Sequence, residues 1–297
     1  MTARPLLAVL ADPDRGFAGA WPDHIQVGRF AAVFADLGFL PRMRRKAAFR
    51  AASARQAALE NLMQHGTVLP ALAQAKIPPA MTESVLNANA AMLDTLSARL
   101  KGRLQYQLRI GGDEHVAKDW LAGRGIFVDV ADAAAEMRRL LAPHVEAIAE
   151  LCDDTRELPL GPSLWANMAL LLAEDHAIQL DREIEALDAV WTDGLAIRLV
   201  GPSPAVSFAS LGTKRHAPAT VDTARTVLGI DGSADACQIA AAERAALFAG
   251  QDPDQIRRAA ELVLLAAQHP KGAPLWQFYI WGENRAMSEA PSARRVA

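Results

Sequence analysis

The chain has 297 residues, of which 51% are hydrophobic, 22% charged and 6% aromatic, and its formal net charge is −3. That length suits two domains, or three, built mainly on aliphatic cores. The charge balance argues against a dedicated nucleic-acid binder, which carries a strong basic surplus. Cys152 and Cys237 have no metal-ligand spacing, so we expect two buried thiols and no disulfide framework.

No stretch of the sequence suits a membrane span. The longest uncharged apolar stretch, "LPLGPSLWANMALLLA" over residues 158–173, contains two prolines and a glycine and is shorter than the roughly 20 residues required. The apolar run near the N-terminus is short and is followed at once by Asp12 and Asp14, unlike a signal peptide. We expect a cytoplasmic protein without a membrane segment.

The first third of the sequence mixes strand and helix patterns. Residues 5–11, "PLLAVLA", form a short apolar run typical of a buried strand, and 24–34 give a second strand whose later part could equally be helical. Apolar residues at three- and four-residue steps predict a helix over 46–66. Residues 67–72 form a strand that Pro70 places at a sheet edge or a bulge.

A second helix and the clearest strand follow. Residues 78–102 show one continuous apolar helical face, and "RLQYQLRI" over 103–110 alternates polar and apolar residues, as a half-buried antiparallel strand does. This order of elements predicts an α+β protein. Its N-terminal domain, residues 1–112, is expected to be a ferredoxin-like sheet with helices.

The middle of the chain is mainly helical in pattern. A polar, glycine-bearing connector over 111–127 marks a domain boundary, and a helix over 129–152 should be kinked or split by Pro143. A long helix is expected over 161–191 and a strand over 195–200. Together these form a helical α+β domain over residues 128–211.

The C-terminal part is expected to be a small helical module over residues 220–284. It follows a polar linker that begins at about Gly212. Its expected elements are helices over 221–230, 235–250 and 252–268, then an aromatic patch over 274–282 and a frayed tail.

A search for catalytic or ligand-binding patterns finds none that fits. The chain has no glycine-rich phosphate loop, no HExxH and no GxSxG, and its seven histidines lack metal-ligand spacing. Asp231, Ser233 and Asp235 start like a calcium loop, but the glycine and the closing acid are missing, so a turn before a helix explains them better. No catalytic, cofactor-binding or metal-ligating residue is therefore expected.

Two clusters of charged residues can be explained without a catalytic or binding role. Glu174, Asp175 and His176 look like an acid–base cluster, but neighbouring residues on a helix point in different directions. The basic run over residues 42–55 could be a patch for an acidic partner, and a solvated loop and helix face is the simpler interpretation.

The segment "LVGPSPAVSF", residues 199–208, argues against a serine hydrolase. A nucleophilic serine needs free backbone N–H donors nearby to bind the oxyanion. Pro202 and Pro204 flank Ser203, remove such donors and favour extended backbone. We expect a stiff structural crossing after which Val206 and Phe208 return to the core.

The same segment carries a family resemblance. "LAIRLVGPSPAVSF" resembles the strand, Gly-Pro-x-Pro and strand signature of the GvpL/GvpF family of gas vesicle proteins. "LWANMALLLAEDHAIQLDREIEAL" is similar to the helix that precedes it in that family, and "LENLMQHGTVLPAL" with "RLKGRLQYQLRI" is similar to its N-terminal block. The resemblance extends over about residues 5–211. Here Ser203 and Val206 stand where the family has aromatic residues.

The resemblance implies a ferredoxin-like N-terminal domain, a helical α+β second domain and no catalytic residue or cofactor. It also implies an accessory or minor structural role in gas vesicle assembly. The implied partners are the hydrophobic shell protein and other gas vesicle accessory proteins; neither nucleic acid nor membrane is implied, and self-association is possible.

Two alternatives remain open at this stage. One is an enzyme of unknown type, because the ferredoxin-like fold supports many activities. The other is a degenerate chaperone cofactor, because residues 221–268 faintly resemble a J-domain. In such domains a His-Pro-Asp lies between two helices, and here Pro253 and Asp254 follow Asp252.

Overall fold

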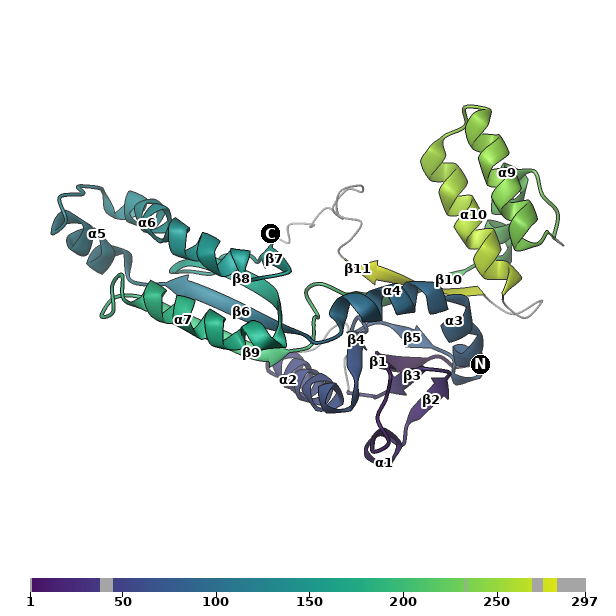
Figure 1. Cartoon of the computed structure of the whole chain (residues 1–297), viewed down its shortest axis with the longest axis horizontal. Helices are drawn as coiled ribbons and strands as arrows, with labels where there is room; N and C mark the ends of the chain where they lie inside the picture. Colours follow the sequence, from purple (N-terminus) through teal and green to yellow (C-terminus); the bar gives the residue numbers. More distant parts are fainter. Residues whose placement is uncertain (1, 38–44, 233, 269–274, 282–297) are drawn as a thin grey trace. The chain divides into compact units, whose positions relative to one another are not determined.

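The computed structural model describes residues 2–37, 45–232, 234–268 and 275–281 (Figure 1). It is an α+β protein with antiparallel sheets, as predicted. Its contacts divide the chain into two compact units. The first unit joins Met1–Arg99 to Ala209–Ala297, and the second is Leu100–Phe208.

The sheet of the first unit has the ferredoxin-like strand order. Its order is β2-β3-β1-β4, every neighbouring pair is antiparallel, and β5 pairs with the start of β1. Helices α1 and α2 connect β1 to β2 and β3 to β4, so each connection passes over one intervening strand. The bounds are β1 Arg4–Ala11, α1 Phe17–Ala20, β2 His24–Val27, β3 Phe30–Phe34, α2 Arg45–Leu62, η1 Met63–His65, β4 Thr67–Pro70 and β5 Lys76–Ile77.

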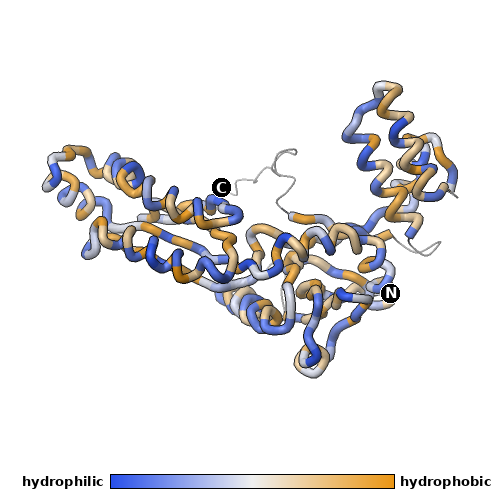
Figure 2. The backbone as a smooth tube through the Cα atoms, viewed as in Figure 1, coloured by the Kyte–Doolittle hydropathy of each residue, from blue (hydrophilic) through white to orange (hydrophobic). Residues whose placement is uncertain are grey.

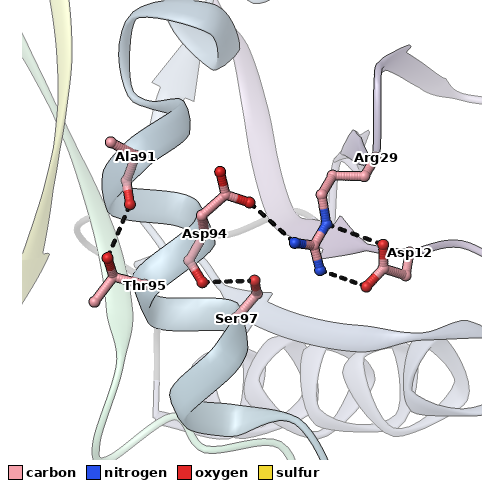
Figure 3. A network of polar contacts seen from close by, with 6 residues as sticks. All are labelled: Asp12, Arg29, Ala91, Asp94, Thr95 and Ser97. Atoms are coloured by element: carbon pink, nitrogen blue, oxygen red, sulfur yellow. Dashed lines mark hydrogen bonds and ion pairs between the residues drawn. The ribbon is translucent and has the colours of Figure 1, made fainter.

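Residues 24–34 form a hairpin, and the helical alternative for their later part is wrong. Gly28, at φ +58°, makes the turn between β2 and β3. Strand β3 lies between β2 and β1, and all of its residues are buried. Figure 3 shows how the turn is held: the Arg29 guanidinium lies between the carboxylates of Asp12 and Asp94. Strand β4 lies at the edge of this sheet, as Pro70 predicted.

The expected helix over 78–102 is in fact two helices. After the short turn η2 (Pro79–Met81), α3 spans Thr82–Ala88 and α4 spans Ala90–Leu100. Asn89 breaks the helix at φ −107° and ψ 11°. Its side chain donates to the Val85 carbonyl at 2.7 Å and accepts the Phe278 N–H at 3.2 Å. Asn89 therefore satisfies the backbone at the break and binds the strand that follows the helical module.

The prediction of a polar linker after Gly212 is also wrong. β10 (Ser210–His216) pairs antiparallel with β11 (Leu275–Trp281), the aromatic patch of the sequence. The Leu72 N–H donates to the Leu211 carbonyl at 2.7 Å, which joins β10 to the end of β4. The three expected helices are confirmed as α8 (Pro218–Leu228), α9 (Ala236–Phe248) and α10 (Pro253–Ala267). The predicted tail lies outside the described residues.

The second unit holds a four-stranded antiparallel sheet in the order β7-β8-β6-β9. The clearest strand of the sequence, β6, pairs with β8 and β9. β6 therefore belongs to the sheet of the second unit. The predicted boundary at residue 112 had instead assigned this strand to the N-terminal domain. The bounds are β6 Arg103–Gly111, α5 Glu114–Ala122, α6 Val130–Glu150, β7 Asp154–Glu157, β8 Leu164–Ala173, η3 Glu174–His176, α7 Ala177–Asp188 and β9 Ala196–Ser203.

Two expectations for this unit need correction, and a third is narrowed. The connector over 111–127 contains α5, which Asp113 caps by accepting the His115 and Val116 N–H groups. The expected helix over 161–191 begins as strand β8, which is interior to the sheet, and only its later part is helical, as α7. Of the two alternatives expected at Pro143, a kink or a split, the split is wrong, because α6 is one helix that contains Pro143.

The helices of the second unit share one core with one face of its sheet. Tyr106, Leu108 and Ile110 of β6 pack in the same buried cluster as residues of α5, α6 and α7. Figure 2 shows apolar residues along the strands and an alternation of apolar and polar residues along the helices. The side chains of β6 that alternate with this buried set point to the opposite face of the sheet.

Candidate interaction surfaces

Ser203 has a structural role, as the sequence predicted. Its hydroxyl is buried and donates to the Gln105 carbonyl at 3.1 Å. The Gln105 side-chain oxygen in turn accepts the Ser207 N–H at 2.8 Å, and the Phe208 side chain is fully buried. The Gly201–Pro202 peptide bond is cis. The proline-flanked segment is thus held across β6, and the serine hydroxyl is used as a donor to the backbone.

The two cysteines differ in environment. Cys152 is half-buried, and burial, followed by the charge of Asp153, raises the pKa of its thiol to about 11. Its Sγ lies 3.2 Å from the Ile148 carbonyl. Cys237 is exposed on α9, so the prediction of two buried thiols is wrong for this residue. Cys152 is a poor nucleophile because its thiolate is disfavoured.

The histidines have separate local contacts. His65 approaches the Asp14 carboxylate at 3.1 Å, and His216 contacts the Gln277 side-chain oxygen at 2.9 Å. Burial is the main cause that lowers the pKa of His216. Within the described ranges, no three His, Cys, Asp or Glu side chains gather to hold a metal ion. His269 lies outside those ranges.

The remaining charged candidates stabilise local structure. Asp235 caps α9 in a capping box with Gln238, which agrees with a turn before a helix; Ser233 lies outside the described residues. Residues 174–176 form the short turn η3, where the His176 Nδ1 lies 3.1 Å from the Leu151 carbonyl. Arg55, at the end of the basic run, donates to the carbonyls of Leu7 and Ala71. It therefore anchors α2 to the sheet and is not part of a solvated face.

Four aromatic and basic side chains form a stack in the second unit. The Arg124 guanidinium lies 3.5 Å from the centre of the Trp120 ring, which stacks on Trp191 at 4.9 Å between ring centres. Trp191 is also parallel to Trp165 at 6.4 Å. A Cβ at Gly194 would lie 1.8 Å from the Trp191 ring, so the stack requires glycine there. This stack packs the end of α5 against β8.

A small cavity of about 230 Å³ lies beside the same sheet. Leu141 and Val145 of α6 face Ile110 and Trp165 across it, and its lining is mainly apolar. Sites for small ligands combine such a lining with several converging polar groups. This cavity is smaller than a typical ligand site and offers few such groups.

The aromatic strand β11 carries the clearest exposed apolar strip. Tyr279 and Trp281 lie on the same face of β11 and are 38% and 45% exposed. The Tyr279 ring lies directly over Gly212 of β10, where a Cβ would approach it to 2.0 Å. We call Tyr279 and Trp281 the β11 strip. The sequence showed it only as an aromatic patch, because the facing glycine becomes visible only once β10 and β11 are paired.

None of the helices in the described part of the chain has the length and apolar character needed to cross a bilayer. No family model matches the chain, and no curated protein sequence matches it. Solved structures resemble it, and two of them are gas vesicle proteins. The crystal structure of the gas vesicle protein GvpF from Anabaena sp. gives a TM-score of 0.55 at 15% identity, covering 71% of this chain and 97% of that one.

The crystal structure of GvpF from Microcystis aeruginosa gives a TM-score of 0.53 at 16% identity, covering 71% of this chain and 100% of that one. The chain has the GvpF fold. The resemblance suggested by the segment around Ser203 is thus supported by independent structures. Because coverage of the two GvpF chains is almost complete, this chain contains the whole GvpF fold and additional residues besides.

Proposed function

We propose that this protein is a non-enzymatic accessory or minor structural protein of gas vesicle assembly, acting in the cytoplasm and at the vesicle. The observation that carries the proposal is the GvpF fold, which covers 97% and 100% of two gas vesicle proteins. The local roles of Ser203, Cys152 and the histidines support a function through binding surfaces. The proposed partners are the hydrophobic shell protein and other gas vesicle accessory proteins.

The physical need for such a partner follows from the shell itself. A subunit that faces gas exposes apolar surface, which aggregates in water until it is covered. The proposed function is to bind these subunits before or during their incorporation. The faces of β1 and β3 are buried and are not available for this purpose. We therefore place the contact at the β11 strip, where two large aromatic side chains are exposed.

The β11 strip has enough area to matter. With Tyr279 at 38% and Trp281 at 45% exposure, the two side chains offer on the order of 150–200 Å² for burial. At about 25 cal/mol per Å², covering this area contributes about 5 kcal/mol at most. Since ordering costs reduce this value, we expect removal of both rings to weaken binding by at least about tenfold.

A pull-down with the purified shell protein tests the proposal. The full chain should retain the shell protein, and Tyr279→Ser with Trp281→Ser should lose most of it. Phe248→Ser is the matched control, because Phe248 lies on α9 in the same unit and is 90% exposed. If the unmodified chain retains no shell protein, the proposed function fails; if the double variant binds as well as the control, the assignment to β11 fails.

A further inference from the structure

Two arginines lie directly opposite each other on the polar face of the second unit's sheet. Arg109 of β6 pairs across the strands with Arg198 of β9 on one side and with Asn167 of β8 on the other. All three side chains point away from the face that packs against the helices, because their neighbours Leu108 and Ile110 point into that core. The sheet thus brings two cations together from strands far apart in the sequence.

A chain of side-chain amides orients the inner arginine. Arg109 Nη2 donates to the Gln107 side-chain oxygen at 3.1 Å, and the Gln107 amide donates to Asn167 at 2.7 Å. The Asn167 amide in turn donates to the Pro159 carbonyl at 2.7 Å. The Arg109 Nε–H is buried and has no hydrogen-bond partner among the residues that the structure describes. A buried donor of this kind is unfavourable until an acceptor reaches it.

The other arginines on this face have partners. Arg103 forms an ion pair with Asp153 at 3.3 Å, and Arg156 donates to the Ser207 carbonyl at 2.7 Å. Neither Arg109 nor Arg198 forms an ion pair with any residue in the described ranges. Like charges placed directly opposite each other on neighbouring strands repel. An anion between these two guanidinium groups would relieve that repulsion and supply the missing acceptor.

The strand that carries Arg198 is an edge strand. β9 pairs with β6 alone, and over 196–200 no hydrogen bond reaches its backbone from any other described residue. Ala196, Arg198 and Val200 are exposed and share a face, while Ile197 and Leu199 pack toward the core. An edge of this kind can accept a further strand from another chain, with side chains on alternate positions giving specificity.

We propose that an extended acidic segment of a partner protein adds to β9 as a strand and places a carboxylate between Arg109 and Arg198. A peptide accounts for both features of the site, the free backbone edge and the paired cations, whereas a free anion uses only the second. The chain's net charge of −3 gives no general attraction for a polyanion such as nucleic acid. This proposal is independent of the β11 strip and of the shell protein.

A designed peptide tests this site directly. The probe is a fluorescein-labelled peptide of alternating valine and glutamate, blocked at both ends, and its binding to the full chain is followed by fluorescence anisotropy. Matched peptides carry glutamine or lysine in place of glutamate. We expect the glutamate peptide to bind at least about tenfold more tightly than the glutamine peptide, and added salt to reduce the difference.

Variants of the exposed arginine separate this site from general electrostatic attraction. Arg198→Ala should weaken binding of the glutamate peptide about tenfold or more, and Arg198→Glu should shift the preference to the lysine peptide. Arg182→Ala is the matched control: Arg182 is an exposed arginine on α7. Unchanged far-ultraviolet circular dichroism verifies that each variant is folded.

Three outcomes would overturn the proposal. The first is the absence of detectable binding of the glutamate peptide to the unmodified chain. The second is equal binding by Arg198→Glu and the unmodified chain. The third is displacement of the peptide by inorganic phosphate or a short oligonucleotide at the same concentration as the unlabelled peptide, which would assign the arginines to a different anion.

Discussion

Replacing Ser203 with alanine tests whether the proline-flanked segment is structural. The change removes one hydrogen bond, from the hydroxyl to the Gln105 carbonyl at 3.1 Å, and deletes a single buried atom. A neutral hydrogen bond of this kind contributes about 1 kcal/mol. We therefore expect the free energy of unfolding to fall by about 1 kcal/mol and the melting temperature by about 2–4 °C.

Gln105→Leu gives a graded comparison. It leaves the Ser207 N–H without its acceptor at 2.8 Å, and an unsatisfied donor of this kind costs about 1–3 kcal/mol. Urea denaturation of the full chain, followed by tryptophan fluorescence and circular dichroism, measures both variants. Both should still bind the shell protein when folded. A Ser203→Ala variant that keeps its stability but loses binding would contradict the structural role, because the hydroxyl would then act on a partner.

Further predictions concern packing, pH and reactivity. Gly194→Ala should destabilise the second unit by about 1–3 kcal/mol in thermal unfolding, because the added Cβ displaces the Trp191 ring; an unchanged melting temperature would contradict this. Because burial lowers the pKa of His216, its contribution is present above the ordinary histidine pKa of about 6.5 and is lost as pH falls below it. His216→Gln should remove that part of the pH dependence of unfolding, and an identical pH profile would count against it. Iodoacetamide at pH 8 should modify the exposed Cys237 much faster than Cys152, as peptide mass spectrometry would show; equal rates would refute this difference.

The sequence alone predicted the type of an element correctly where its residues follow one clear periodicity. Residues 103–110 alternate so regularly that β6 was identifiable, and the three helices α8, α9 and α10 have ordinary apolar stripes and caps. Pro70 correctly indicated an edge strand. The α+β class was predicted correctly, and the ferredoxin-like order is present in the N-terminal sheet, but its fourth strand is β4 and not β6 as the sequence order had suggested.

Tertiary pairing overruled local preference elsewhere. Eight of the ten residues of β8 are Ala, Leu or Met, which favour helix, yet it is an interior strand between β7 and β6. β10 has a polar sequence, and its partner β11 follows three helices later, so no local pattern indicated that the two strands pair. One missed element did have a local signal: Asp113 followed by Glu114 is typical of a helix start, and α5 begins there.

The candidate surfaces depended on pairing in the same way. Arg109 and Arg198 each occupy the polar side of a recognisable strand, but only the register of β6 with β9 places them opposite each other. The exposure of Tyr279 and Trp281 likewise depends on β11 lying beside β10. The absence of a catalytic centre and the partners implied by the resemblance stay predictions from the sequence, while the positions of the candidate surfaces required the fold.

The most direct test of the central claim is whether the purified full chain keeps the purified shell protein in solution. The two proteins are mixed in buffer with EDTA and without nucleotide, centrifuged, and the shell protein in the supernatant is measured. A non-enzymatic binder predicts that soluble shell protein rises in proportion to the chain added and reaches a fixed ratio. Shell protein that pellets regardless of the amount of chain, or that stays soluble only with ATP or a divalent metal, would contradict the account.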